Sequence, residues 1–415
     1  MFMQRLAGLR PSLPILIGAA VMLSIAMGLR QSLGLFMQPA VRDLGIRVSD
    51  VTLAIAIQNL AWGFLQPFAG AIAERRGFAP VLMAGVLMFV AGLVVLALAQ
   101  GTFGIIMGAG VLIGLALACC ASAMAMAVAS RPVPAALRST VLGLVSAFGS
   151  LGAMLSAPIG QSLSAGWGWR WGVAGFVVLA LAMIPAAWFA GKVDQVPLPP
   201  RVRGEAEAAS AGAVTRQALR HWPFMVMSCA YFICGLQLMF LSTHLPSYLD
   251  LCGMDPMLSA QALGVIGGFN VLGSLFFGWA GGRWNKAGLL GGLYLTRSVV
   301  LAWYFMAAPT PTTTLIFAAL MGFLWLGVAP LIAGLVAEMF GLRWQAMVQG
   351  LAFTSHQLGS FLGAYGAGLL FDAAGNYDLV WKLGVGIGLL AGTVQLLAGM
   401  MVPIAPPSTA KLYWK

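Results

Sequence analysis

Two arginines lie inside long apolar stretches of the sequence, where an ionisable side chain is costly and usually functional. Arg30 lies toward the C-terminal end of the stretch 13–37, and Arg297 lies near the middle of 288–307. A guanidinium group is a planar fork of hydrogen-bond donors that matches a carboxylate. No acidic residue is expected well inside these stretches, so an organic anion is the natural counter-ion of Arg30. The alternative is that Arg30 extends outward to lipid headgroups.

Arg297 has two interpretations that the residues leave open. It is either a second positive charge at the wall of a binding cavity, or a structural group that bonds a neighbouring helix. His356 and His244 lie in the stretches 347–371 and 224–248 and titrate near neutral pH. We predict both as candidates for proton coupling, and the deeper His356 also as a substrate contact. A histidine that only bonds a neighbouring helix is the alternative.

Uncharged polar side chains are few in the apolar stretches, and they complete the candidate substrate-binding set. The predicted contacts are Asn59, Gln237, Asn270 and Gln357. For each of them a hydrogen bond between helices is at least as plausible as a ligand contact. Among the aromatic residues, Trp62 is either a side chain that lines the cavity or part of the packed core.

The composition shows what must position these residues. The chain has 415 residues, of which 60% are hydrophobic and only 8% charged. In a soluble domain about a quarter of the residues are charged, so the composition excludes an ordinary soluble enzyme. A helix that spans a bilayer needs about 20 mostly apolar residues. The sequence predicts an all-α integral membrane protein with twelve spans near 13–37, 51–73, 80–99, 104–129, 139–163, 171–191, 224–248, 260–281, 288–307, 313–336, 347–371 and 379–403.

The basic residues predict the orientation of these spans. The net charge of +11 would suggest nucleic acid in a soluble protein, but here Lys and Arg gather in cytoplasmic loops. With both termini in the cytoplasm, 16 basic residues lie inside and four outside. We therefore predict a multi-pass protein of the inner membrane with cytoplasmic termini and no nucleic-acid partner.

The chain divides into two similar halves. The segment 192–222 breaks the apolar pattern with prolines and charges, so we predict a six-helix bundle over 1–191, a cytoplasmic linker over 192–222 and a second six-helix bundle over 223–415. A shift of 207 residues brings Gly143 onto Gly350 and Gly152 onto Gly359, and a shift of 208 brings Gly70 onto Gly278. Arg30 then matches Gln237, so one half offers a cation where the other offers an amide. Parallel six-helix repeats with a site between them are one architecture of transporters.

A short motif lies between the second and third spans. It contains Gly70, Glu74, Arg75, Arg76 and Gly77. It resembles the G-x-x-x-D-R-x-G signature of the major facilitator superfamily, with Glu in place of Asp. The resemblance implies the fold of that superfamily, with two pseudo-symmetric bundles, and a gating role for this loop. The matching loop of the second half has Gly282 where an acid would stand, so a weaker charged contact is expected there.

The first span is similar to that of bacterial members of the monocarboxylate transporter group, in which a basic residue precedes a G-x-F-like segment. Here Arg30 precedes Gly34 and Phe36. The resemblance implies that Arg30 binds a substrate carboxylate. Eukaryotic members place an Asp and an Arg in the eighth span, and the span 260–281 has no charge. Their proton-coupling scheme therefore cannot be transferred to this chain.

These observations predict a secondary transporter, not an enzyme. It would move a small organic anion, above all a monocarboxylate, by alternating access, either coupled to protons or in exchange for another anion. Efflux of amphipathic or drug-like compounds is the alternative, and a sensor that has lost transport is a weaker third. The sequence has no cofactor motif and no cluster with metal-ligand spacing. The resemblance implies a monomer.

Overall fold

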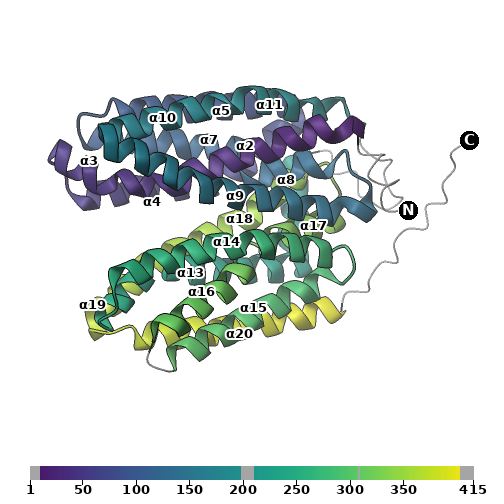
Figure 1. The fold of residues 1–415 in the computed structure, drawn as a ribbon. Helices are drawn as coiled ribbons and strands as arrows, with labels where there is room; N and C mark the ends of the chain where they lie inside the picture. The colour runs from purple at the N-terminus through teal and green to yellow at the C-terminus, as the bar shows by residue number, and fades with distance from the viewer. Residues whose placement is uncertain (1–9, 198–209, 307–308, 402–415) are drawn as a thin grey trace, which may run out of the picture.

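The computed structural model describes residues 10–197, 210–306 and 309–401, and every element within these ranges is helical. Figure 1 shows the helices gathered in two groups that lie side by side, one coloured purple to blue and the other green to yellow. The helices of the first half are η1 (Arg10–Ser12), α2 (Leu13–Ser32), η2 (Leu33–Phe36), α3 (Met37–Leu44), α4 (Val48–Arg76), α5 (Phe78–Ala97), α6 (Thr102–Ile105), η3 (Ile106–Leu112), α7 (Ile113–Cys120), α8 (Ser122–Ser130), α9 (Ala135–Trp167), α10 (Trp169–Leu181) and α11 (Met183–Gly191).

The second half follows the same plan. After η4 (Lys192–Gln195) come α12 (Ala211–Arg220), α13 (Trp222–Leu251), α14 (Pro256–Ala280), α15 (Lys286–Phe305), α16 (Pro311–Trp325), α17 (Val328–Phe340), α18 (Gln345–Phe361), η5 (Leu362–Gly366), α19 (Ala367–Ala374) and α20 (Asp378–Met401). Each of the twelve predicted spans coincides with one of these helices or with a run of consecutive ones.

Nine stretches of the described residues are long and apolar enough to cross a membrane by length and composition. The three spans outside this set are α4, α15 and the run from α18 to α19. These three carry the polar side chains Gln58, Asn59, Gln66, Arg297, His356 and Gln357, which lower their mean hydropathy. The spans that fall short of a simple hydropathy test are therefore the ones that hold most of the predicted site.

Each half has its own apolar core. One buried cluster runs from Ile15 to Val193 and takes only Ala333 and Ala346 from the other half. The second cluster runs from Val214 to Trp381. The predicted boundaries at 191 and 223 stay a prediction, and residues 198–209 of the predicted linker lie outside the described part of the chain.

The glycines that match between the halves lie where helices cross closely. A Cβ atom on Gly143 of α9 would lie 2.5 Å from the Cα atom of Gly278 in α14. In the matching place, a Cβ on Gly70 of α4 would lie 2.4 Å from the backbone nitrogen of Met347 in α18, and one on Gly350 would lie 2.7 Å from that of Pro67. Small residues allow such close approach of helix backbones. The repeated glycines thus mark two equivalent crossings between the halves.

The fourth and tenth spans are interrupted at equivalent places. The fourth breaks at Ala121, between α7 and α8, and the tenth breaks at Leu326 and Gly327, between α16 and α17. A break in a membrane helix leaves backbone groups that need new partners. Gln66 of α4 donates to the carbonyl oxygen of Ala118 at 2.8 Å, and Asn270 of α14 accepts from the amide of Leu326 at 3.0 Å. A side-chain amide from the neighbouring span therefore satisfies each break.

Candidate functional site

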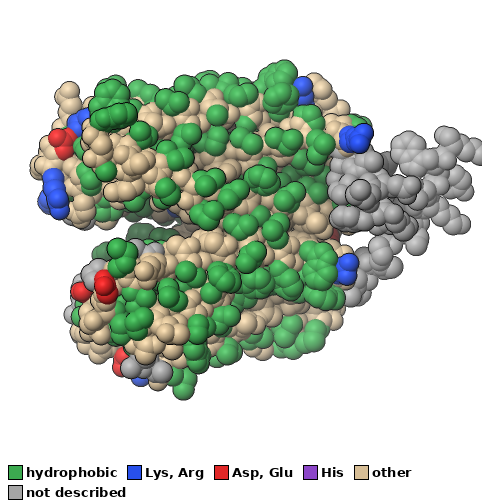
Figure 2. Space-filling model, viewed as in Figure 1, with side chains coloured by type: hydrophobic (Ala, Val, Ile, Leu, Met, Phe, Trp, Pro, Cys, Tyr) green, Lys and Arg blue, Asp and Glu red, His purple; other side chains and the backbone are tan. Residues whose placement is uncertain are grey.

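The two halves touch at one end of the molecule and separate at the other. Figure 2 shows a hollow between the halves at the end where α3 and α19 lie. We call this the open end, and the opposite end, where α2 begins and α20 finishes, the linker end. Contacts between α4 and the segment from Arg343 through α18 follow one another from the linker end inward, from Glu74 to Asn59. The candidate site lies where this series ends, on α2, α4, α13 and α18.

Arg30 lies on α2, at the inner end of these contacts, and is partly buried. Its Nη2 atom donates a hydrogen bond to Oδ1 of Asn59 on α4 at 2.5 Å, and its guanidinium lies 4.9 Å from the centre of the Trp62 ring. Its Nε atom is buried and has no hydrogen-bond partner. Among the described residues, no carboxylate forms a salt bridge with Arg30. The guanidinium therefore retains donor capacity and an unbalanced positive charge.

Asn59 connects Arg30 to the other half of the molecule. The Nε2 atom of Gln357 on α18 donates to the backbone oxygen of Asn59 at 3.1 Å and to its Oδ1 atom at 3.3 Å. One amide oxygen thus accepts hydrogen bonds from both halves. Because Arg30, Asn59 and Gln357 come from three helices, their contact depends on how the halves are placed.

Aromatic rings adjoin this polar group. The ring of His356 lies nearly parallel to that of Phe353, with centroids 5.5 Å apart, and 4.5 Å from that of Tyr231 on α13. Phe353 in turn packs against Trp62 at 4.6 Å. The Nδ1 atom of His356 lies 3.2 Å from Oε1 of Gln357. Sequence reasoning missed Phe353, since an apolar ring in an apolar helix carries no signal of its own.

Arg297 and Gln237 lie together but inside the second half, between α13, α15 and α20. The Nε atom of Arg297 donates to Oε1 of Gln237 at 3.0 Å, and its Nη1 atom lies 3.3 Å from Sγ of Cys234. Gln237 donates to the carbonyl oxygen of Gly384 at 2.8 Å. Arg297 is fully buried, and its hydrogen bonds go to Gln237 and Cys234 and not to the Arg30 group.

Two other predicted residues lie elsewhere. Asn270 satisfies the break in the tenth span, as described above. His244 of α13 uses both ring nitrogens: Nδ1 lies 3.0 Å from the Tyr377 hydroxyl and Nε2 lies 2.9 Å from the carbonyl oxygen of Ala364. His244 therefore ties α13 to η5 and to the start of α20, apart from His356.

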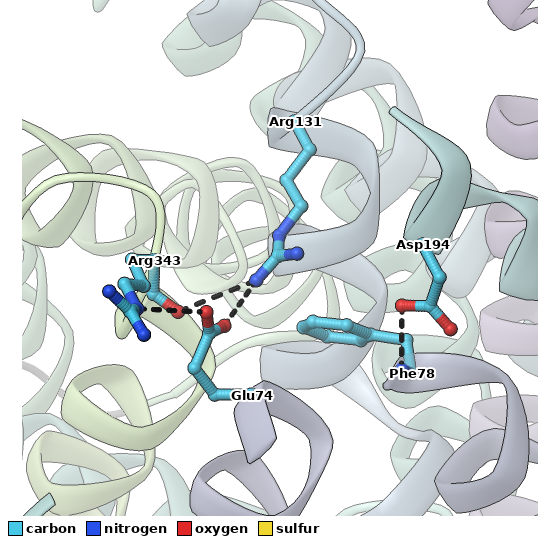
Figure 3. Close-up of polar contacts among 5 residues, drawn as sticks. All are labelled: Glu74, Phe78, Arg131, Asp194 and Arg343. Carbon is cyan, nitrogen blue, oxygen red and sulfur yellow. Dashed lines mark hydrogen bonds and ion pairs between the residues drawn. The ribbon is translucent and has the colours of Figure 1, made fainter. Parts of the chain in front are cut away.

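The predicted gating motif lies at the linker end, shown in Figure 3. The carboxylate of Glu74 forms an ion pair with Nη2 of Arg131, which follows α8, and lies 3.4 Å from Nε of Arg343 in the second half. The side chains of Glu74 and Arg131 are only 6% and 8% exposed. Arg131 also stacks on Phe78 at 4.5 Å. The sequence showed Arg131 and Arg343 only as cytoplasmic loop charges, and nothing in it identified them as partners of Glu74.

The remaining residues of the motif act differently. Arg75 and Arg76 are exposed. Gly77 has φ of 92°, a conformation that favours glycine, and a Cβ there would lie 2.8 Å from Asp194. Asp194 of η4 accepts from the backbone amides of Phe78 and Ala79 at 2.8 and 2.9 Å, so it caps the N-terminus of α5. A carboxylate is favourable at that position because of the helix dipole.

The comparison with known families agrees with this architecture. The model of the Major Facilitator Superfamily matches residues 16–364. The chain belongs to the major facilitator superfamily. This confirms the predicted family and its fold, and membership supports a transporter and not an enzyme at the level of the family.

Individual relatives of this major facilitator protein are distant. Monocarboxylate transporter 13 of Rattus norvegicus is 24% identical over 386 residues, which cover 90% of this chain and 85% of that protein. An uncharacterized MFS-type transporter of Bacillus subtilis, YcxA, is 23% identical over 395 residues and covers 89% of this chain and 90% of its own. The predicted similarity to the monocarboxylate transporter group is therefore confirmed at low identity.

Solved structures show the same fold. The E. coli fucose:proton symporter FucP superimposes with a TM-score of 0.70 at 16% identity, over 94% of this chain and 98% of that one. The proton:xylose symporter XylE gives 0.64 at 15% identity, over 94% of each chain. At this identity the likeness concerns the fold alone.

Proposed function

We propose that this transporter moves a small organic anion, a monocarboxylate above all, by alternating access. The observation that carries the proposal is the state of Arg30. Its Nε atom has no partner, no described carboxylate pairs with it, and its neighbours Asn59 and Gln357 join the two halves. A cation in a membrane protein needs a partner or water. A substrate carboxylate supplies the missing charge and accepts the unused donor.

We propose further that the linker end faces the cytoplasm of a cell bounded by an inner membrane, with both termini on that side. Support comes from the excess of Lys and Arg in the loops of this end. In this orientation the hollow in Figure 2 opens to the outside. The structure then corresponds to an outward-open state that is ready to receive substrate, in a transporter that acts as a monomer.

Binding and opening are coupled through Asn59 in this proposal. A carboxylate on Arg30 competes with the Oδ1 atom of Asn59 for the guanidinium. The same atom accepts from Gln357, so the anion changes a contact between the halves. A ligand shifts a conformational equilibrium only when it binds the two states differently. Charge balance comes from a proton on His356 or from exchange for a second anion.

The test is carboxylate binding and uptake with Arg30→Ala and Arg30→Lys. A ligand that binds only the folded protein raises its Tm. We expect a monocarboxylate to stabilise the purified protein and to be taken up by proteoliposomes. Arg30→Ala should abolish both effects, and Arg30→Lys should retain a weakened response because it keeps the charge without the fork. Equal uptake by Arg30→Ala and the unaltered protein would refute the proposal.

The efflux alternative predicts a different profile. An apolar cavity of about 340 Å³ lies within the second half, lined by residues of α13, η5, α19 and α20 that include Phe240 and Trp381. It is separate from the site between the halves, so it gives efflux no direct route. Loss of the gene should change drug sensitivity if the protein is an efflux pump. It should leave drug sensitivity unchanged if the protein imports an organic anion.

A further inference from the structure

Most hydrogen-bonding groups around Arg30 are already engaged with one another. Gln357 donates to Asn59, and Asn59 accepts from Arg30. The Nε1 atom of Trp62 donates to Oε1 of Gln66 at 3.0 Å, and Gln66 donates to a backbone oxygen at the break in the fourth span. A ligand rich in hydroxyl groups would find few partners here, and unpaired hydroxyls in a closed site are costly.

Several polar groups beside these rings make no hydrogen bond within the described structure. They include the buried Nε of Arg30, whose guanidinium lies over the Trp62 ring, the hydroxyl of Tyr231 and Nε2 of His356. In the described structure neither the Tyr231 hydroxyl nor this histidine nitrogen makes a hydrogen bond within the protein. The site thus offers a guanidinium group that can donate to a carboxylate. The Tyr231 hydroxyl and the His356 ring nitrogen are two weaker polar groups at the edges of rings.

Four aromatic rings gather beside Arg30 and Gln357. Phe353 and His356 present two nearly parallel rings, with an interplanar angle of 10°. Tyr231 and Trp62 adjoin this pair from two other helices. Phe353, His356 and Tyr231 are each partly buried, so each keeps some exposed ring surface. Rings pack most favourably on other rings, in offset or edge-to-face geometry.

We infer that the substrate is a flat monocarboxylate whose body is an aromatic or conjugated ring with few hydroxyl groups, held by Arg30 at its carboxylate and by Phe353, His356 and Tyr231 at its ring. This inference rests on the proposed function, because it assumes that Arg30 binds a carboxylate. Beyond the proposed function, it states that the flat shape and the π-surface of the ligand determine which carboxylates the site binds. It also separates this chain from transporters of sugars, whose ligands carry many hydroxyls.

Two ligands of similar size test the inference. Benzoate and cyclohexanecarboxylate share a carboxylate on a six-membered ring, but only benzoate is flat. A pocket that binds only through burial of apolar surface would favour the saturated ring, which has the larger apolar surface. We expect benzoate to bind the full-length, detergent-solubilised protein with a Kd roughly tenfold lower, measured by calorimetry and by the rise in Tm. Equal binding, or tighter binding of cyclohexanecarboxylate, would overturn the inference.

A pair of variants assigns the preference to the rings. Phe353→Leu removes one member of the parallel pair and keeps an apolar side chain, so the preference for benzoate should shrink severalfold while dependence on Arg30 remains. Phe103→Leu is the matched control, because Phe103 lies on α6 and is 78% exposed. A benzoate preference that survives Phe353→Leu unchanged would contradict the assignment. If Phe353→Leu fails to fold, the comparison of the two ligands in the unaltered protein still decides the substrate class.

The outcomes also separate this inference from the proposed function. Arg30-dependent binding of both carboxylates without preference would refute the ring specificity and leave the anion site standing. Binding of neither carboxylate, or binding that persists in Arg30→Ala, would refute both.

Discussion

The two lines of contact between the halves have the same backbone geometry but different chemistry. The first seam joins α4 to α18, and the second joins α9 to α14. Both have glycines at closest approach, at Gly70 and Gly350 in the first seam and at Gly143 and Gly278 in the second. The first seam adds the contact of Glu74 with Arg343 across the halves, beside the buried pair that Glu74 forms with Arg131 of its own half. Hydrogen bonds from Thr354 and Gln357 to α4 add to it.

The second seam lacks such a cluster within the described chain. Its polar contact is a hydrogen bond of 3.2 Å between Ser146 and Ser274. Gly282 occupies the place of Glu74, as the sequence indicated. In the same repeat, Glu338 occupies the place of Arg131 and pairs with Lys286 of its own half. The repeat thus keeps the close packing of helix backbones at both seams, while among the described residues the charged contact occurs at one seam only.

Among the changes that test this difference between the two seams, Glu74→Gln is expected to lower stability the most. This change removes the charge that pairs with Arg343 across the seam, and it leaves Arg131 of the same half buried without its ion pair. Breaking a buried pair typically costs about 3–5 kcal/mol. The closed linker end should lose stability, so spin labels on the linker ends of α4 and α18 should move apart. Glu338→Gln is the control, because Glu338 is 55% exposed and its pair is worth at most about 1 kcal/mol. Equal effects of both changes would show that the two seams do not differ in charge dependence.

A smaller effect is expected from Gly278→Ala in the second seam. The added Cβ would lie 2.4 Å from the Cα of Gly143, so the backbones must separate, at a cost of about 1–3 kcal/mol. Gly264→Ala in the same helix meets nothing within 4 Å and should be neutral or stabilising by about 1 kcal/mol. Thermal unfolding of both variants in detergent measures the difference. If the two alanines behave alike, close backbone contact is not what holds the second seam.

The smallest effect is expected from Ser274→Ala. Ser274 is fully buried and shares one hydrogen bond with Ser146, and such bonds between membrane helices average about 0.6 kcal/mol. The Tm should fall by a few degrees at most, with transport retained. A loss as large as that of Glu74→Gln would mean that the second seam depends on polar contacts after all.

The helices and the repeat could be predicted because they follow from local patterns. Apolar runs of sufficient length predict spans, and glycines at a constant shift predict equivalent crossings. The role of Arg30 remains a prediction, but that no carboxylate of the described residues pairs with it was expected from the distribution of acids. These features depend on residue type and spacing alone.

Partners between distant segments could not be predicted in this way. Gln237 matched Arg30 in the repeat, yet it bonds Arg297 and Gly384, where α13, α15 and α20 meet. Asn270 has a polar side chain of the kind that binds ligands. Its oxygen instead accepts from the backbone amide of Leu326, at the break in the tenth span. In both cases the choice depends on packing that hydropathy does not record.

The interruptions of the fourth and tenth spans affect how far a conformational change must extend. α8 and α17 have 9 and 13 residues, so each is a short rigid rod at the linker end. A rod that is joined to its outer part by a few irregular residues, with a side-chain amide beside the joint, can tilt without carrying the whole helix. Such joints would let the linker end open by the tilt of these segments, without rotation of both halves as undivided bodies.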